Sequence, residues 1–174
     1  MTNYKDIPMG ANAPQVVNAI IEIPRGSRNK IEYDPELGIF RLDRVLYSAV
    51  HYPHSYGFIP STLWDDGDPL DILVFCDQEL LTGLLLEVIP IGGLEMSDDK
   101  GSDLKIIAAA AGDQSVKHLR EYTDIAEHRR IEIEHFFETY KLLEEKGVTI
   151  GKWINAADAH ESILRASVAY QAAK

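Results

Sequence analysis

The densest group of acidic side chains in the sequence lies at residues 65–71, in the run Asp-Asp-Gly-Asp-Pro-Leu-Asp. Gly67 supplies unusual backbone angles and Pro69 fixes φ, so this run is expected to form a tight loop. The apolar run Ile72–Phe75 that follows is typical of a buried strand. The sequence therefore predicts an acidic loop held at the mouth of a rigid strand.

Three carboxylates of this loop, on Asp66, Asp68 and Asp71, repel one another unless cations bind between them. Hard cations with oxygen ligands, Mg²⁺ first, are their natural partners. An ordinary acidic surface loop explains the run equally well when it is considered alone. An EF-hand is not indicated, because the required order of acidic residues and the distal Glu are missing.

A second acidic loop, residues 97–103, also precedes an apolar segment. If the two strands that follow these loops are neighbours, both loops lie at one end of the fold and form a multi-metal site. Two metal ions ~3.5–4 Å apart can clamp the attacking and leaving oxygens of an in-line displacement. The acidic candidates are Asp66, Asp68, Asp71, Asp98, Asp99 and Asp103.

Basic and phenolic side chains elsewhere in the chain suit a substrate with several phosphoryl oxygens. Arg binds two oxygens at once, Lys acts as a point charge, and Tyr donates a hydrogen bond without adding charge. The candidates are Lys30, Arg44, Lys105, Lys141, Tyr52, Tyr56 and Tyr140. Structural roles are open for two of them. Lys141 can form an i,i+4 pair with Glu145 on a helix, and Arg44 can pair with Asp43 or Glu36.

The composition is that of one acidic globular domain, residues 1–174. Of the 174 residues 45% are hydrophobic, and the net charge of −11 argues against general binding to nucleic acid or to anionic membranes. The single cysteine, Cys76, cannot form an internal disulfide. No secretory signal is apparent and no apolar stretch approaches the ~18 residues that span a bilayer. We therefore expect a cytoplasmic protein; an organelle remains open.

The elements expected to position these groups are mostly short strands. Alternating and β-branched segments predict strands at Val16–Ile23, Lys30–Tyr33, Ile39–Leu46, 72–75, Leu84–Ile91, Leu104–Ala109 and Val148–Trp153. Gly92-Gly93 is expected to end the strand that begins at Leu84. Residues 1–15 are expected to be irregular.

Two helices are predicted late in the chain. The first spans Asp124–Lys146, with Asp124 and Glu127 resembling a capping box and Gly147 ending the helix. The second spans about 156–171 and begins after Asn155 as its cap. Many short strands followed by two helices predict a mainly β (α+β) fold, a small barrel packed by helices.

Further motifs accompany the acidic run Asp66–Ile72. They are Ile-Glu-Ile-Pro (21–24), Arg-Asn-Lys-Ile-Glu-Tyr (28–33), Leu-Asp-Arg-Val-Leu (42–46), His-Tyr-Pro-His-Ser-Tyr-Gly-Phe-Ile-Pro (51–60), Asp-Leu-Lys-Ile-Ile-Ala (103–108) and His-Phe-Phe-Glu-Thr-Tyr-Lys (135–141). With these motifs in this order, the sequence resembles the soluble family I inorganic pyrophosphatases over about residues 16–170, and Asp66–Ile72 matches the family signature Asp-x-Asp-Pro-x-Asp-x.

The resemblance implies an OB-like five-stranded closed barrel flanked by two helices in the C-terminal half. It also implies hydrolysis of pyrophosphate to two phosphates with several Mg²⁺ ions per site, other divalent ions being possible. A homo-oligomer is implied as well. The short chain resembles the bacterial or plant type, which favours a homohexamer over a dimer or trimer.

Residue roles follow from the same resemblance. Asp68 is implied to be the base that faces the metal-bound water, and Asp71 the bridge between the first two metal ions. The implied metal ligands are Glu32, Asp66, Asp71, Asp98 and Asp103. The implied substrate-binding residues are Lys30, Arg44, Tyr56, Lys105, Tyr140 and Lys141. The implied supporting residues are Glu22, Tyr52 and Asp99.

The sequence departs from the family pattern at a few positions. Ile89 stands where the family usually has Arg, and Asp99 replaces a more usual Glu. Ser102 replaces a usual acidic residue, and Gly151 a usual Glu. None of these departures removes a residue implied to contact metal or phosphate. We expect Ile89, in place of the usual Arg, to affect local packing, interface contacts or the level of activity.

Two other functions compete with this one. The first is a barrel that only binds, either an OB-type nucleic-acid module or a metal-dependent scaffold. The nucleic-acid module is disfavoured because the aromatic residues lie among carboxylates rather than basic residues. A nucleoside-triphosphate or polyphosphate hydrolase is the enzymatic alternative. The sequence contains no P-loop pattern Gly-x-x-x-x-Gly-Lys-Ser/Thr.

Overall fold

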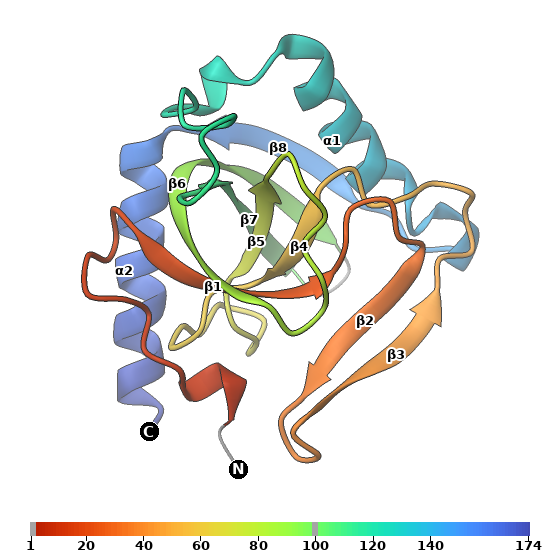
Figure 1. Ribbon diagram of the computed structural model, residues 1–174. Coiled ribbons are helices and arrows are strands. Elements are labelled where there is room, and N and C mark those ends of the chain that lie inside the picture. Colours follow the sequence, from red (N-terminus) through yellow and green to blue (C-terminus); the bar gives the residue numbers. More distant parts are fainter. Residues whose placement is uncertain (1–2, 99–100) are drawn as a thin grey trace.

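Strands dominate the computed structural model, which describes residues 3–98 and 101–174 (Figure 1). The strands are β1 (Val17–Ile23), β2 (Asn29–Asp34), β3 (Ile39–Val45), β4 (Ser55–Phe58), β5 (Asp71–Phe75), β6 (Leu85–Asp98), β7 (Gly101–Ala110) and β8 (Thr149–Ile154). The α-helices are α1 (Glu127–Thr139) and α2 (Ala156–Ala172), and short 3₁₀ turns occupy Tyr4–Asp6, Tyr122–Asp124 and Leu142–Glu144.

Five strands close into a ring. The main sheet has the order β1-β4-β5-β7-β6-β8, and β1 also pairs with β6. All of these pairings are antiparallel except β5 with β7, which run parallel. The β2–β3 hairpin forms a separate two-stranded sheet. The prediction of a mainly β fold with an OB-like five-stranded barrel and two late helices is confirmed.

The prediction that Gly92-Gly93 ends a strand is wrong, because β6 continues to Asp98. The pairing of β6 with β7 shifts register between Pro90 and Gly92. Gly92 has φ +152°, and a Cβ there would lie 2.6 Å from the carbonyl oxygen of Ile154. The glycine therefore permits a bulge against the backbone of β8, and the strand runs on into the second acidic loop.

The first helix is shorter than predicted at both ends. Asp124 does not cap it. Its carboxylate instead accepts hydrogen bonds from the backbone N–H groups of Arg120 and Glu121, at 2.8 and 2.9 Å, and closes the 3₁₀ turn that precedes the helix. At the other end the chain leaves the α-helix after Thr139, well before Gly147. Tyr140 and Lys141 therefore lie just past the end of α1.

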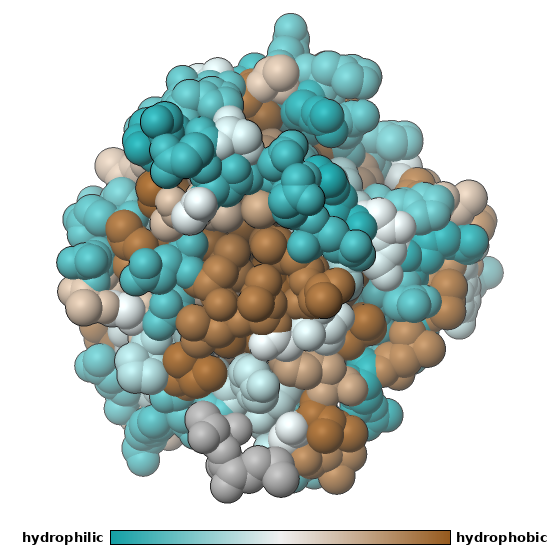
Figure 2. Space-filling view, viewed as in Figure 1, coloured by the Kyte–Doolittle hydropathy of each residue, from teal (hydrophilic) through white to brown (hydrophobic). Residues whose placement is uncertain are grey.

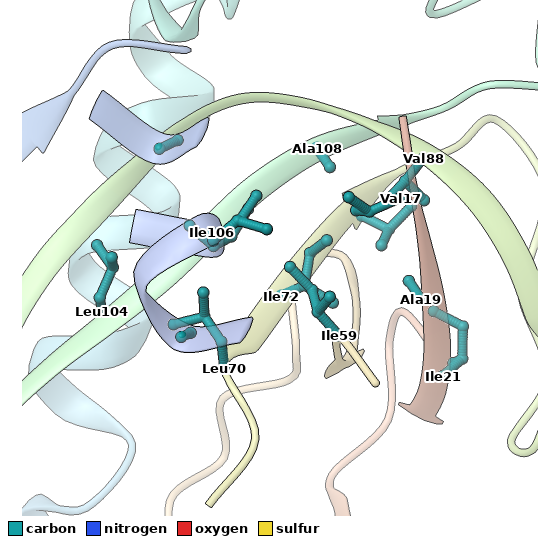
Figure 3. Packing of buried hydrophobic residues seen from close by; sticks show 14 of the residues in the cluster. Val17, Ala19, Ile21, Ile59, Leu70, Ile72, Val88, Leu104, Ile106 and Ala108 are labelled. Carbon is teal, nitrogen blue, oxygen red and sulfur yellow. The ribbon is translucent and has the colours of Figure 1, made fainter. Parts of the chain in front are cut away.

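The second helix is confirmed. It spans Ala156–Ala172, and the side chain of Asn155 accepts a hydrogen bond from the N–H of Asp158 at 2.9 Å. Its buried residues Ala159, Ile163 and Ala166 join the hydrophobic cluster of the barrel. Figure 3 shows apolar side chains of β1, β5, β6 and β7 gathered beside this helix.

A second hydrophobic cluster joins the barrel to α1. Phe136, Phe137 and Ile133 of the helix pack with Tyr52, Tyr56 and Leu73. This cluster fixes the position of the residues that follow α1.

No helix in the described part of the chain is both long and apolar enough to cross a bilayer.

His54 is a buried histidine whose pH response is testable. It is 5% exposed, and its ring lies 3.8 Å from that of Phe75, centroid to centroid. Burial, with the charges of Arg129 and Arg25, lowers the pKa of His54 to about 4 from the usual value of about 6.5. Below pH 6.5 the unfolded chain therefore takes up a proton that the folded chain does not, and stability falls as the pH falls toward 4.

Replacing His54 by Phe is expected to remove this pH response while keeping the ring packing. Between pH 7.5 and pH 5 the wild-type chain should lose about 2 kcal/mol more unfolding free energy than His54→Phe. Urea unfolding at the two pH values measures the difference. Equal losses in both proteins would contradict the prediction.

Candidate active site

A cavity of about 210 Å³ gathers most of the predicted site residues. Those that line it are Glu22, Lys30, Glu32, Tyr56, Asp66, Asp68, Asp71, Asp98, Asp103, Lys105, Tyr140 and Lys141. They come from β1, β2, β4, the loop before β5, the first residue of β5, both strands of the β6–β7 hairpin and the residues just past α1. Segments far apart in the sequence therefore meet at one site.

The two acidic loops meet because the strands that follow them are neighbours. β5 and β7 run parallel, and Asp71 at the start of β5 lies opposite Lys105 of β7. Asp103 comes two residues before Lys105, and Asp98 ends the adjacent strand β6. The expectation that adjacent strands bring both loops to one end of the fold is confirmed for the described residues.

Lys105 lies at the centre of this arrangement. It is 4% exposed, and its Nζ donates to Asp71 Oδ2 at 2.5 Å and lies 2.7 Å from Asp103 Oδ2. Nζ also lies 5.5 Å from the centre of the Tyr56 ring. Burial lowers the pKa of Lys105, but Asp71 and Asp103 outweigh burial and hold its pKa above the usual value. Lys105 therefore stays charged in the cavity.

The other lysines of the cavity also face carboxylates. Lys141 Nζ donates to Asp98 Oδ2 at 2.8 Å, so Lys141 is held by the second acidic loop and not by the helix neighbour Glu145. Lys30 pairs with Glu32. Lys5, from the N-terminal segment, donates to Asp68 Oδ1 at 3.2 Å.

Two carboxyl groups of the cavity have raised pKa values because they are buried close to other carboxylates. Burial raises the pKa of Asp66, and the charges of Asp71, Asp68 and Asp103 raise it further against a backbone hydrogen bond that lowers it. Burial, with smaller contributions from Asp71 and other carboxylates, raises the pKa of Glu22 to about 8. Glu22 accepts a hydrogen bond from the N–H of Tyr33 at 2.8 Å.

Arg44 and Tyr52 lie outside the cavity lining. Arg44 Nη2 donates to Glu144 Oε2 at 3.2 Å, and the guanidinium also pairs with Asp43. The Asp43 partner is one of the two considered from sequence. Tyr52 is 2% exposed and packs against Tyr56, with ring centroids 5.4 Å apart. Asp99 lies outside the described residues.

The cavity also contains residues that the sequence did not single out as site residues, among them Lys5, Tyr33 and Ser102. Lys5 lies 63 residues before Asp68, in a segment predicted to be irregular. No local pattern links it to the acidic loop. Tyr33 follows Glu32 along β2 and ends the motif at residues 28–33, which could have pointed to it.

The donor set of the cavity fits hard divalent cations. Among the described residues, seven carboxyl groups and four lysines line it, and none of the lining residues is a histidine or a cysteine. Within residues 3–98 and 101–174 no three His, Cys, Asp or Glu side chains form a ready coordination shell. Lysine ammonium groups lie against Asp71, Asp103 and Asp98 instead. The excess of negative charge and the raised pKa of Asp66 favour added cations.

Comparison with known proteins gives one family. The family model described as inorganic pyrophosphatase matches residues 19–171. An inorganic pyrophosphatase of Thermus thermophilus is 53% identical over 88% of this chain and 86% of its own length. A soluble inorganic pyrophosphatase of Oryza sativa is 45% identical over 92% of this chain and 75% of its own length.

Comparison with solved structures gives the same family. The crystal structure of the inorganic pyrophosphatase from Thermus thermophilus matches with a TM-score of 0.96 and 47% identity, and the alignment covers 98% of this chain and 99% of that one. A structure of the inorganic pyrophosphatase from Helicobacter pylori matches with a TM-score of 0.89 and 38% identity over 95% of this chain and 98% of that one. The chain belongs to the inorganic pyrophosphatase family.

Proposed function

We propose that this chain hydrolyses inorganic pyrophosphate to two orthophosphates. The observation that supports this most directly is the cavity itself, in which two acidic loops meet several lysines of the described chain. Carboxylates can hold the cations that accompany a polyphosphate, and Lys30, Lys105 and Lys141 can bind its oxygens. The cavity of about 210 Å³ is below the roughly 300–1,000 Å³ of pockets that hold drug-sized ligands, which favours a small substrate over a nucleotide.

The reaction is a phosphoryl transfer to water. The oxygen of the water forms a bond to one phosphorus while the bond from that phosphorus to the bridging oxygen breaks. Asp68 accepts a proton from the attacking water. The second phosphate leaves with the bridging oxygen, and its developing charge is stabilised by Lys30, Lys105 and Lys141 with Arg44 nearby. Tyr56 and Tyr140 can donate hydrogen bonds without adding charge.

Several Mg²⁺ ions are proposed to accompany the substrate. Asp66, Asp71 and Asp103 would hold the first, with Asp71 shared with a second, and Glu32, Asp98 and Asp103 would hold ions that arrive with pyrophosphate. When bound, these ions supply Lewis acidity and neutralise phosphoryl charge. Lys30, Lys105 and Lys141, which pair with these carboxylates, would bind the substrate oxygens.

Phosphate release tests the proposal. Purified chain is incubated with pyrophosphate or with ATP, each with and without Mg²⁺. We expect release from pyrophosphate that requires Mg²⁺ and little release from ATP. Preferred release from ATP would favour the nucleoside-triphosphate hydrolase, and no release from either would overturn the proposal. A mobility-shift assay with single-stranded DNA or RNA checks the nucleic-acid alternative, and no shift is expected.

Replacing Asp71 by Ala is expected to raise the Mg²⁺ concentration needed for half-maximal activity by about tenfold or more, because loss of a group that supports a bound metal typically costs 10–100-fold in affinity. Asp65→Ala is the matched control. Asp65 is a neighbouring loop carboxylate that pairs with Arg165 and lies outside the cavity lining. Calorimetric Mg²⁺ titration gives a readout independent of turnover. Identical titrations for the wild type and Asp71→Ala would remove Asp71 from this role.

A cytoplasmic homo-oligomer, with a hexamer favoured, completes the proposal. Figure 2 shows apolar area exposed in the middle of the face seen in Figure 1. Exposed large apolar residues are found on the β2–β3 hairpin and around the start of β6, and include Leu37, Ile39, Leu42, Val45, Leu81, Leu84 and Leu85. Exposed apolar surface of this kind marks protein–protein contact sites, and its presence here supports an oligomer in which other copies of the chain cover it. Sedimentation velocity measures the oligomeric state, and a chain that is monomeric at micromolar concentration would refute the proposed homo-oligomer.

A further inference from the structure

The N-terminal segment is fixed to the barrel by its backbone. The carbonyl oxygen of Lys5 accepts a hydrogen bond from the N–H of Ser61 at 2.8 Å, and Ser61 Oγ donates to the carbonyl oxygen of Ile7 at 2.8 Å. The Tyr4 ring packs edge-on against that of Tyr33, with centroids 5.1 Å apart. The prediction of an irregular segment therefore misses a short 3₁₀ turn, Tyr4–Asp6, that is held from both sides.

The same turn is tied to the end of the chain. The carboxylate of Asp6 accepts a hydrogen bond from Tyr170 and lies 3.2 Å from Nζ of Lys174. Figure 1 shows this turn near the C-terminal end of α2. Lys5 is thus carried on a backbone fixed by the barrel, by an aromatic contact and by α2, and only its side chain is free to move.

That side chain enters the cavity and meets Asp68. Lys5 Nζ lies 3.2 Å from Asp68 Oδ1, and the side chains are 25% and 69% exposed respectively. Lys5 is also one of the residues that line the cavity. The backbone of Asp68 is held by the loop, since its N–H donates to Asp66 Oδ1 at 3.1 Å and its carbonyl oxygen accepts from the N–H of Trp64 at 2.8 Å.

The carboxylate of Asp68 lacks comparable restraint from the loop. Within the described residues, Lys5 is the only cationic side chain paired with it. An exposed carboxylate on a fixed backbone samples several rotamers, and a cation on an equally fixed backbone favours one of them. Lys5 is therefore placed to restrict Asp68 to the rotamer in which its carboxylate meets Lys5 at the cavity lining.

We propose that Lys5 is a positioning residue for Asp68, acting from the N-terminal segment on the group that accepts the proton of the attacking water. The inference rests on the proposed function. It differs from a role in substrate binding, because Lys5 acts through Asp68 and not on phosphate. Its loss should therefore lower kcat and leave KM unchanged.

The test is a double-mutant cycle for pyrophosphate hydrolysis at saturating Mg²⁺. Lys5→Gln should lower kcat about 1.4- to fivefold, the range that exposed ion pairs span, without changing KM. Lys5→Arg, which keeps the charge, should restore most of the loss. In the Asp68→Asn background, Lys5→Gln should have no further effect on kcat, because the group on which it acts is already absent.

A matched control separates this role from a loss of surface charge. Lys152→Gln removes an exposed lysine whose Nζ lies 3.9 Å from Glu95 Oε1, and it should leave kcat and KM unchanged. Equal kcat for the wild type and Lys5→Gln would overturn the inference. So would a rise in KM, or a loss in the Asp68→Asn background as large as in the wild type. Wild-type chain that releases no phosphate would overturn the proposed function and, with it, this inference.

Discussion

Replacing Asp68 by Asn is expected to lower kcat for pyrophosphate hydrolysis by about 10²–10⁴, the usual size of a lost general base. Asn has nearly the same shape and cannot accept the proton of the attacking water. Asp68 lines the cavity and is the most exposed of the paired carboxylates there, at 69% of its side chain. The fold should therefore tolerate the change. Steady-state kinetics at saturating Mg²⁺ measures the effect.

The neighbouring carboxylate Asp65 supplies the control for this variant. Asp65 lies in the same loop, is 52% exposed and pairs with Arg165 outside the cavity lining. Asp65→Asn should keep kcat within about twofold, because it removes an exposed ion pair and no group of the site. Urea unfolding should give nearly the same midpoint for both variants. An Asp68→Asn enzyme as fast as the wild type would remove Asp68 from the role of base.

The site could be predicted from sequence where local chemistry and local structure coincide. The acidic loop at 65–71 combines turn residues with carboxylates and runs into an apolar strand, so both its conformation and its chemistry are visible in a few consecutive residues. The helix after Asn155 could be predicted for the same reason, because its N-cap residue and the spacing of its apolar residues can be read from consecutive positions in the sequence.

The parts of the fold and of the site that could not be predicted depend on contacts between distant segments of the chain. Nothing near Gly92 indicates that the backbone of β8 will approach it and that β6 will continue as a bulged strand. The length of α1 is set by the way Asp124 closes the preceding turn and by the packing of its last residues against the barrel. Lys5 reaches Asp68 only because the barrel folds the N-terminal segment back. Such pairings follow from tertiary structure, which overrides propensity.

Replacing Lys105 by Met is expected to affect stability and activity together. Lys105 is 4% exposed and lies within 2.7 Å of carboxylate oxygens of both Asp71 and Asp103. Without its charge these two carboxylates face each other unpaired. Breaking a buried ion pair costs about 3–5 kcal/mol, and the lower end is expected because both carboxylates keep some contact with water. Urea unfolding without Mg²⁺ measures this loss.

The same substitution should reduce kcat by about 10²–10³, the cost of losing one preorganised group that stabilises developing charge. Lys105→Arg keeps the charge and should lose less than Lys105→Met in both measurements. Because Mg²⁺ can supply the missing positive charge between the carboxylates, adding it should stabilise Lys105→Met more than the wild type. If the two proteins unfold at the same urea concentration without Mg²⁺, Lys105 does not relieve the repulsion between the two acidic loops.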